Sequence, residues 1–219
     1  MNLPFFAVYG ASGCGRGIMP LARMQLAQDG IPCERLVFVD DSERVPPMLN
    51  GHRVMCYAQF LAEPASVRHV VVAIANGAVR EKLARRCAAD GIRPWTVVAS
   101  NVVMMDGAMV GEGAVLSPFV TLTSNIRIGR YFHANLYSYV EHDCVIGDFV
   151  TFAPRVMCNG NVHIEDHAYI GTGAIIKQGR PGQPLVIGCG AVIGMGAVVT
   201  RDVPAGATVV GNPARLLVK

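Results

Sequence analysis

The sequence is poor in charged and in aromatic residues. Only 16% of its 219 residues are Asp, Glu, Lys or Arg, and only 7% are Phe, Trp or Tyr, with a single Trp. So little charge beside 52% hydrophobic residues excludes an intrinsically disordered chain. The scarcity of large aromatic side chains argues against a few large cores and favours many small, repeated packing layers.

A basic segment and a long apolar run are also missing. Residues 1–99 contain 11 Lys or Arg against 8 Asp or Glu, and residues 100–219 contain 8 against 8. Without a basic stripe, the chain does not resemble a nucleic-acid-binding protein. The longest apolar run, residues 70–75, is far too short to span a membrane. The N-terminus has no basic stretch followed by an apolar one, so we expect no signal peptide.

The cysteines lack the pattern of a disulfide framework. They number seven, which is odd, no two have the C-x-x-C spacing, and several stand within apolar runs. This usage predicts reduced, mostly buried thiols and a cytoplasmic protein.

The first half of the chain alternates strand-like and helix-like segments. Residues 5–9, 36–39 and 69–75 form short apolar runs typical of buried strands. A glycine-rich turn, residues 10–17, follows the first run and leads into a helical stretch at 18–28, and a second helix is expected up to about residue 90. This alternation predicts a small parallel α/β sheet.

The second half repeats every six residues. Thirteen positions at this spacing, from Met104 to Ile176, are all hydrophobic, and a second series of mostly small or aliphatic residues stands four positions after them. The phase breaks at a polar loop, residues 177–184, and we expect it to resume at Ile187, Ile193, Val199 and Ala205. A six-residue period with an aliphatic anchor predicts a β-helix in which each hexapeptide supplies a short strand and a corner.

Three segments resemble a known family. They are Gly10–Gly15 after the first strand, Val140–Phe149 within the repeat, and the tail Gly211–Arg215, which follows Val203–Gly206. The second half is similar to the left-handed β-helix acyltransferases of the hexapeptide-repeat superfamily. The whole chain resembles its sialic-acid O-acetyltransferase and bacillosamine-pathway N-acetyltransferase group.

The resemblance implies two domains with different tasks. Residues 1–97 would form a Rossmann-like domain that holds the nucleotide of the acceptor, and residues 98–219 would form a left-handed β-helix. It further implies a homotrimer with acetyl-CoA bound between adjacent subunits and a nucleotide-linked amino sugar as acceptor. We therefore expect N-acetylation of a nucleotide-diphosphate-linked 4-amino-4,6-dideoxy sugar in surface glycan biosynthesis, without a metal.

His142 is the candidate catalytic base. It stands between two inward positions, Val140 and Cys144, so the repeat places it at a corner with its side chain outward. A neutral imidazole is suited to accept the proton of an attacking amine near pH 7. In the family a carboxylate follows this histidine and orients its ring, and Asp143 stands there. Taken by themselves, the two residues fit a surface histidine and a turn residue.

Substrate-binding residues are expected in both halves. Ser12, Gly13, Cys14 and Gly15 form a strand-to-helix turn where backbone N–H groups could approach a diphosphate, although a plain tight turn fits the residues nearly as well. Asp40 and Asp41 end the second strand, where an acid often binds ribose hydroxyls. The resemblance implies coenzyme contacts at the positions Thr151, Thr172, Gly173, Gly194 and Met195. Some relatives carry a second histidine where this chain has Thr151.

Two alternatives remain at this stage. A sugar O-acetyltransferase of the sialic-acid branch would carry the same histidine motif. A zinc β-helix hydratase would need three histidines converging between subunits. We interpret His133, His163 and His167 as corner residues rather than as metal ligands.

Overall fold

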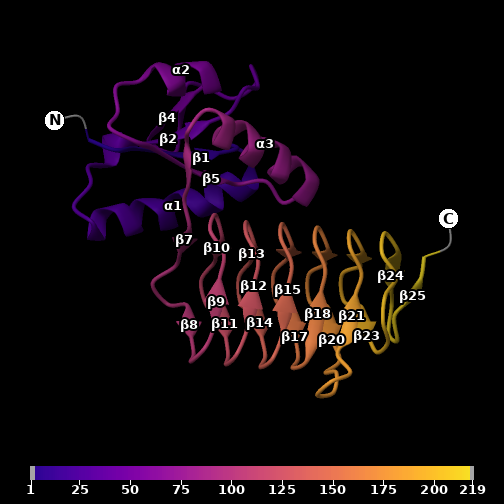
Figure 1. The fold of residues 1–219 in the computed structure, drawn as a ribbon. Helices are drawn as coiled ribbons and strands as arrows, with labels where there is room; N and C mark the ends of the chain where they lie inside the picture. The colour runs from indigo at the N-terminus through magenta and orange to yellow at the C-terminus, as the bar shows by residue number, and fades with distance from the viewer. Residues whose placement is uncertain (1–2, 218–219) are drawn as a thin grey trace.

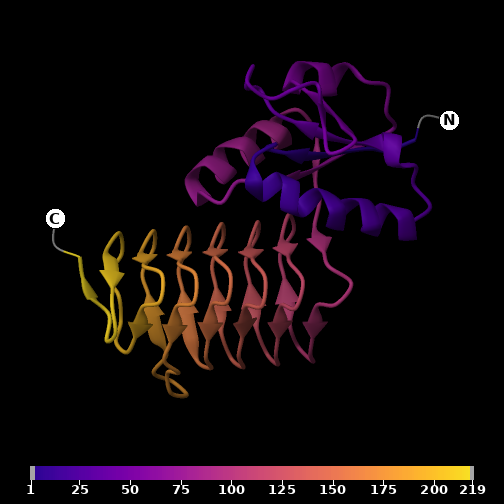
Figure 2. The same cartoon turned by 180° about the vertical axis from the view of Figure 1, so that it is seen from behind.

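The chain folds into a sheet-and-helix unit and a prism of short strands, which lie against each other (Figure 1). The computed structural model describes residues 3–217. The N-terminal unit lies above one edge of the prism, and both views show α1 and α3 facing it (Figures 1 and 2). Neither unit contains a helix that is long and apolar enough to cross a membrane, within the residues described.

The N-terminal unit is built on a six-stranded sheet with the order β3-β4-β2-β1-β5-β6, in which every pairing except β3 with β4 is parallel. In chain order its elements are β1 (Phe5–Tyr9), α1 (Gly13–Gln28), the short 3₁₀ helix η1 (Cys33–Arg35), β2 (Leu36–Val39), β3 (Met48–Leu49), β4 (His52–Met55), α2 (Tyr57–Ala62), β5 (Arg68–Val72), α3 (Gly77–Ala89) and β6 (Arg93–Pro94).

Both faces of this sheet are covered, which explains why its central strands are apolar throughout. Alternate residues of β1 face opposite sides: Phe6 and Val8 pack with α1, whereas Phe5, Ala7 and Tyr9 pack with α2 and α3. The parallel sheet predicted for this half is therefore present. The sequence did not predict β4 and α2, which are short and carry polar residues.

The sequence predicted a turn over residues 10–17, but most of this glycine-rich segment is helical. Helix α1 begins at Gly13, so Gly13, Gly15 and Gly17 belong to its first turns. A Cβ atom on Gly15 would overlap the carbonyl group of Gly10. Gly15 therefore permits close approach of the helix to the end of β1, because only glycine lacks the atom that would collide.

The second unit is a three-sided prism of parallel strands. We name its sheets face A, face B and face C, with eight, six and five strands. Face A contains β7 (Val97–Val98), β10 (Val115–Leu116), β13 (His133–Ala134), β16 (Thr151–Phe152), β19 (Tyr169–Ile170), β22 (Val192–Ile193), β24 (Thr208–Val210) and the antiparallel β25 (Arg215–Leu216). Face B contains β8 (Val103–Met104), β11 (Thr121–Leu122), β14 (Tyr139–Val140), β17 (Met157–Cys158), β20 (Ile175–Ile176) and β23 (Val198–Val199). Face C contains β9 (Met109–Val110), β12 (Arg127–Ile128), β15 (Val145–Ile146), β18 (Val162–Ile164) and β21 (Leu185–Ile187).

The six-residue period corresponds to one strand and one corner. Both hydrophobic series point into the prism, where from Ala114 to Val199 they form one continuous core. Parallel strands stacked on three faces are consistent with the predicted left-handed β-helix. The anchors at the two ends deviate. Met104 is 45% exposed because it lies in the first coil, and Ala205 is exposed because the phase shifts again, so that Val203 and Val209 occupy the inward positions.

Each corner holds a residue with a left-handed backbone. Corner 1, between faces B and C, has Asn125, Asp143 and Asn161 at φ of 58°, 57° and 55°. Corner 2, between faces C and A, and corner 3, between faces A and B, hold further sets with φ between 54° and 64°, or glycine at some coils. The corner 2 set is Tyr131, Phe149 and His167, and the corner 3 set is Phe119, Tyr137 and Arg155. This conformation favours glycine and asparagine and is strained for larger residues. The aromatic residues at these corners stack on those of the neighbouring coils, which stabilises them there.

The two units share a core at corner 2 and along face A. Tyr131 and Phe149 stack with ring centroids 5.0 Å apart and are buried with residues of α2 and α3. On the other side, Val97 and Val115 of face A are buried against α1. The last strand of the first sheet is β6, and β7 already belongs to face A. The predicted domain division after residue 97 stays a prediction.

Candidate active site

His142 and Asp143 form a hydrogen-bonded pair at corner 1. The Nδ1 atom of His142 lies 2.8 Å from Oδ2 of Asp143, and both side chains are about half exposed. The carboxylate can only accept, so Nδ1 carries the proton and Nε2 keeps a free lone pair. The hydrogen bond that His142 donates to Asp143 raises the pKa of His142 above its usual value. The neighbouring Asp143 thus makes the exposed His142 imidazole more basic.

The next coil leaves room for this imidazole. A Cβ atom on Gly160 would overlap the His142 ring, and the N–H of Asn161 donates to the His142 carbonyl. One coil further, the N–H of Gly179 donates to the carbonyl of Gly160. Corner 1 therefore continues into the loop between β20 and β21, which projects from the edge of the prism opposite the N-terminal unit (Figure 1). Gly160 was not singled out from the sequence, because a glycine at a corner is unremarkable there.

A pocket of about 570 Å³ lies at the carboxyl ends of the central strands of the first sheet. It is lined by Gly10 after β1, by Asp40 and Asp41 after β2, and by Lys82 and Arg86 of α3, among others. Strands β2 and β5 lie on opposite sides of β1, so the strand order reverses there, and ligands of open parallel sheets bind at such a point. We call this the strand-end pocket.

The two aspartates of this pocket are held by internal hydrogen bonds. Asp40 accepts from the backbone N–H of Ala11 at 2.8 Å and of Ser42 at 3.0 Å. Asp41 accepts from the Tyr57 N–H, the Tyr9 hydroxyl and Arg86. Partial burial opposes ionisation of Asp41, but these donors outweigh it and lower its pKa. Both carboxylates are thus fixed at the rim of the pocket.

A second cavity, of about 440 Å³, lies between the two units. Gly13 and Cys14 of α1 line it from above, and residues of face A that include His133, Asn135 and Thr151 line it from below. We call it the inter-unit cavity. The turn from β1 into α1 separates it from the strand-end pocket, since Gly10 lines one and Gly13 the other. Ser12, which caps α1 without a side-chain hydrogen bond, is exposed at the same turn.

Arg80 of α3 was missed by sequence reasoning, although it is fully buried. Its guanidinium donates to Oγ1 of Thr151 and to five backbone carbonyls, which belong to Ile74, Ala75, Tyr131, Phe149 and Val150. Burial lowers the pKa of Arg80 to about 10. In the sequence it stands in a helix rich in Lys and Arg, where a surface position is the ordinary expectation.

The residues expected to hold the coenzyme fall into two places. Thr172 and Gly173 lie on the coil next to that of Gly194 and Met195, and the N–H of Gly196 donates to the Thr172 carbonyl. Met195 is 81% exposed. Thr151 lies apart from these four, at the start of β16, where its hydroxyl donates to the Ala75 carbonyl at 2.8 Å and its side chain is nearly buried.

Three other predictions concern histidines and cysteines. Only His167 lies at a corner; His133 and His163 lie within β13 and β18, so their interpretation as corner residues was wrong. All seven cysteines are free thiols, but only Cys87, Cys144 and Cys158 are buried, fewer than predicted. From residue 3 to residue 217, no three His, Cys, Asp or Glu side chains are grouped so that they could hold a metal ion.

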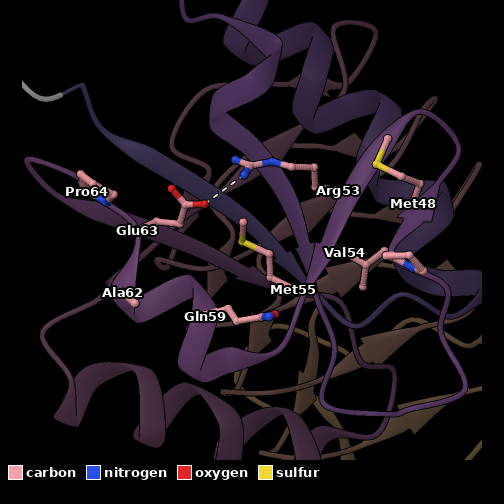
Figure 3. A pocket seen from close by; sticks show the side chains of 9 residues that line it. Met48, Arg53, Val54, Met55, Gln59, Ala62, Glu63 and Pro64 are labelled. Atoms are coloured by element: carbon pink, nitrogen blue, oxygen red, sulfur yellow. Dashed lines mark hydrogen bonds and ion pairs between the residues drawn. The ribbon is translucent and has the colours of Figure 1, made fainter.

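A further pocket, of about 560 Å³, opens at the outer edge of the first sheet (Figure 3). It lies between β4, α2 and the segment after α2, and an ion pair of 2.9 Å between Arg53 and Glu63 crosses it. None of the residues predicted to bind substrate or coenzyme lines it.

Similarity to known proteins identifies the family. No protein-family model matches the sequence. The chain is 51% identical to the GDP-perosamine N-acetyltransferase of Escherichia coli O157:H7 over 215 residues, which cover 98% of this chain and 96% of that one. The chain belongs to the hexapeptide-repeat sugar N-acetyltransferases.

Solved structures of this family have the same fold along the whole chain. WeeI from Acinetobacter baumannii AYE is 56% identical, with a TM-score of 0.95 over 98% of this chain and 100% of WeeI. The acetyltransferase domain of PglB from Neisseria gonorrhoeae FA1090, solved in complex with acetyl coenzyme A, is 29% identical, with a TM-score of 0.84 over 99% of this chain and 100% of that domain. The predictions of the family and of an acyltransferase are thus confirmed. The similarity favours the N-acetyltransferase over the O-acetyltransferase and hydratase alternatives.

Proposed function

We propose that the protein transfers the acetyl group of acetyl-CoA to the amine of GDP-perosamine or of a closely related nucleotide-linked 4-amino-4,6-dideoxy sugar. The hydrogen-bonded pair of His142 and Asp143 carries this proposal, because it supplies an exposed base at a corner of the β-helix. The relative that is 51% identical is named GDP-perosamine N-acetyltransferase, and this similarity supports the choice of the acceptor.

His142 acts as general base in this reaction. Its Nε2 atom accepts a proton from the amine as the nitrogen attacks the thioester carbonyl carbon. A C–N bond forms, the C–S bond breaks, and the same proton can pass from the imidazolium to the departing sulfur. Asp143 holds the Nδ1–H tautomer and stabilises the charged ring. No group of the protein becomes acetylated.

The acceptor spans the turn between β1 and α1. Its nucleoside occupies the strand-end pocket beside Asp40 and Asp41, as in a Rossmann-like nucleotide-binding unit, and its diphosphate crosses Ser12, Gly13, Cys14 and Gly15 at the N-terminus of α1. The sugar then enters the inter-unit cavity. Both pockets border this turn, which supports the assignment. We also propose the division into residues 1–97 and 98–219.

The coenzyme lies along the last coils of the prism. Thr172, Gly173, Gly194 and Met195 line its pantetheine arm, where backbone groups on neighbouring coils are accessible. Thr151 contacts the coenzyme end from face A, with its hydroxyl oriented by Ala75. Acetyl-CoA as co-substrate and seven free thiols fit a cytoplasmic enzyme.

The active enzyme is a homotrimer with the reaction site between subunits. His142 lies on corner 1, whereas the acceptor pockets of the same chain lie around the N-terminal unit on the opposite edge of the prism. The base of one subunit therefore serves an acceptor bound to another. The segment 131–140, which runs from corner 2 across face A to face B, contains no Asp, Glu, Lys or Arg, and its exposed Leu136 and Tyr137 support a contact with another subunit.

The deciding experiment is an acetyl-transfer assay with a panel of acceptors. GDP-, UDP- and dTDP-linked 4-amino-4,6-dideoxy sugars are each mixed with acetyl-CoA and the enzyme, and release of the CoA thiol is followed. We expect GDP-perosamine to give the highest kcat/KM. Preferential acetylation of matching sugars that carry a hydroxyl in place of the amine, assayed beside this panel, would overturn the N-acetyl assignment. A fully active monomer in sedimentation at micromolar concentration would contradict the shared site.

A further inference from the structure

His133 is a buried polar residue for which the fold alone gives no full explanation. It belongs to β13 on face A, between Val115 and Thr151 in the neighbouring strands, and its side chain lines the inter-unit cavity. The residue is 6% exposed, and its Nε2 atom has no hydrogen-bond partner. A buried polar atom without a partner is costly, so its retention calls for a reason.

The surroundings of the ring determine which nitrogen is free. The backbone of Val72 lies beside the ring and favours protonation of the imidazole, as a carbonyl acceptor does. Nε2 has no hydrogen-bond partner, so we assign the ring proton to Nδ1. Burial and the neighbouring Arg80 guanidinium lower the pKa of His133 far below its usual value, so the ring is neutral. Nε2 is therefore an acceptor that lacks a donor.

The cavity that His133 lines suits a polar ring of moderate size. Apolar groups from α1 and face A form most of its lining, with the Ser117 hydroxyl and the Asn135 amide as further polar groups. Such a lining, with few polar groups, is typical of a site that orients a small ligand. An acceptor nitrogen recognises a ligand that brings an O–H or N–H group.

We infer that His133 is a specificity-determining residue of the acceptor site, whose Nε2 accepts a hydrogen bond from a ring hydroxyl of the sugar in the inter-unit cavity. The inference rests on the proposed function. A 4-amino-4,6-dideoxyhexose linked through C1 keeps free hydroxyls only at C2 and C3, so one of these is the donor. A sugar without that hydroxyl leaves Nε2 unpaired, and the site discriminates against it.

Two variants separate the two ring nitrogens. In H133N the amide can take the place of Nδ1 and keep a donor toward the Val72 backbone, but nothing remains at the position of Nε2. In H133Q the longer side chain places an amide oxygen near the position of Nε2. The wild type and both variants are assayed as the proposed trimers with GDP-perosamine and with its 2-deoxy and 3-deoxy analogues. Thermal melting of each protein checks that it is folded.

We expect the wild type to lose about 3- to 10-fold in kcat/KM with one of the two deoxy analogues, the size of one neutral hydrogen bond. H133N should show a similar loss with GDP-perosamine and no longer distinguish that analogue, whereas H133Q should retain the preference. The KM for acetyl-CoA should not change in either variant. A wild type that treats both analogues like GDP-perosamine, or an H133N enzyme that keeps the preference, overturns the inference.

A measurement on the wild type keeps the test valid if H133N does not fold. The protein is labelled with ¹⁵N-histidine and titrated with GDP-perosamine without acetyl-CoA. The Nε2 resonance of the neutral buried histidine should move upfield as it accepts a hydrogen bond, and an unchanged resonance at saturation contradicts the inference. Absence of acetyl transfer to GDP-perosamine by the wild type would instead contradict the proposed function.

Discussion

Arg80 and Thr151, 71 positions apart, join the two units of the protein. Nη1 of Arg80 lies 3.0 Å from Oγ1 of Thr151, and the same hydroxyl donates to the Ala75 carbonyl just before α3. The guanidinium has no carboxylate partner among its hydrogen bonds and instead donates to carbonyls on both sides of the interface. Because a buried charge is costly unless its donors are satisfied, this arrangement fixes how α3 sits on corner 2.

Replacing Arg80 should therefore destabilise the protein severely. In Arg80→Met five carbonyls lose a buried donor, and we expect the free energy of unfolding to fall by at least about 3 kcal/mol. Urea unfolding followed by circular dichroism measures the change. Arg85→Met is the matched control in the same helix, because Arg85 is exposed and its ion pair with Glu81 contributes little. Equal midpoints for the two variants would contradict the structural role of Arg80.

Removal of the His142 side chain should abolish most of the activity and leave the fold intact. His142→Ala should lower kcat by about 10²- to 10⁴-fold, the usual contribution of a general base. The side chain is half exposed and points away from the core, so circular dichroism should match the wild type. Steady-state kinetics should show a much smaller change in acceptor binding. A folded variant with more than about a tenth of the wild-type kcat would exclude His142 as the base.

Asp143→Asn should change the pH dependence. The hydrogen bond to Asp143 raises the pKa of His142, so the neutral base of the wild type is lost as pH falls through this raised value. Without the carboxylate the pKa of His142 drops, and the acidic limb of the kcat–pH profile should shift to lower pH. We also expect a smaller loss of kcat than in His142→Ala. An acidic limb that stays in place would show that another group sets it.

Alanine should destabilise the protein at only one of two glycines of α1. A Cβ on Gly15 overlaps the Gly10 carbonyl, whereas a Cβ on Gly13 has no atom within 4 Å. Gly15→Ala should lower the melting temperature markedly, since backbone must shift to relieve the overlap. Gly13→Ala should leave it nearly unchanged. Thermal melting of both variants tests the close approach of α1 to β1, which equal melting temperatures would contradict.

Gly13→Val tests where the acceptor lies. Gly13 is helical and its Cβ position is open, so the effect should come from the side chain at the rim of the inter-unit cavity. The acceptor KM should rise while the KM for acetyl-CoA stays constant. A parallel rise of both constants, with an unchanged melting temperature, would argue against the assignment of this turn to the acceptor.

The sequence by itself determined the β-helix, the parallel sheet and the corner position of His142. The reason is that these features are local: each hexapeptide carries its own inward anchor, and the phase of the repeat directs every other side chain. The end anchors show the limit of this rule. Met104 has no coil stacked on its outer side, and Val203 and Val209, rather than Ala205, pair with Ile187 and Ile193.

Only the tertiary structure decided the roles of Arg80, Thr151 and His133. Arg80 stands in a helix whose sequence indicates a solvated surface, yet its acceptors at Tyr131 and Phe149 lie about 50 to 70 positions further along the chain. His133 resembles any polar strand residue until the N-terminal unit covers face A and buries its Nε2 atom. Burial and pairing between distant segments exist only after the two units pack together, because no local pattern in the sequence encodes the partner across that interface.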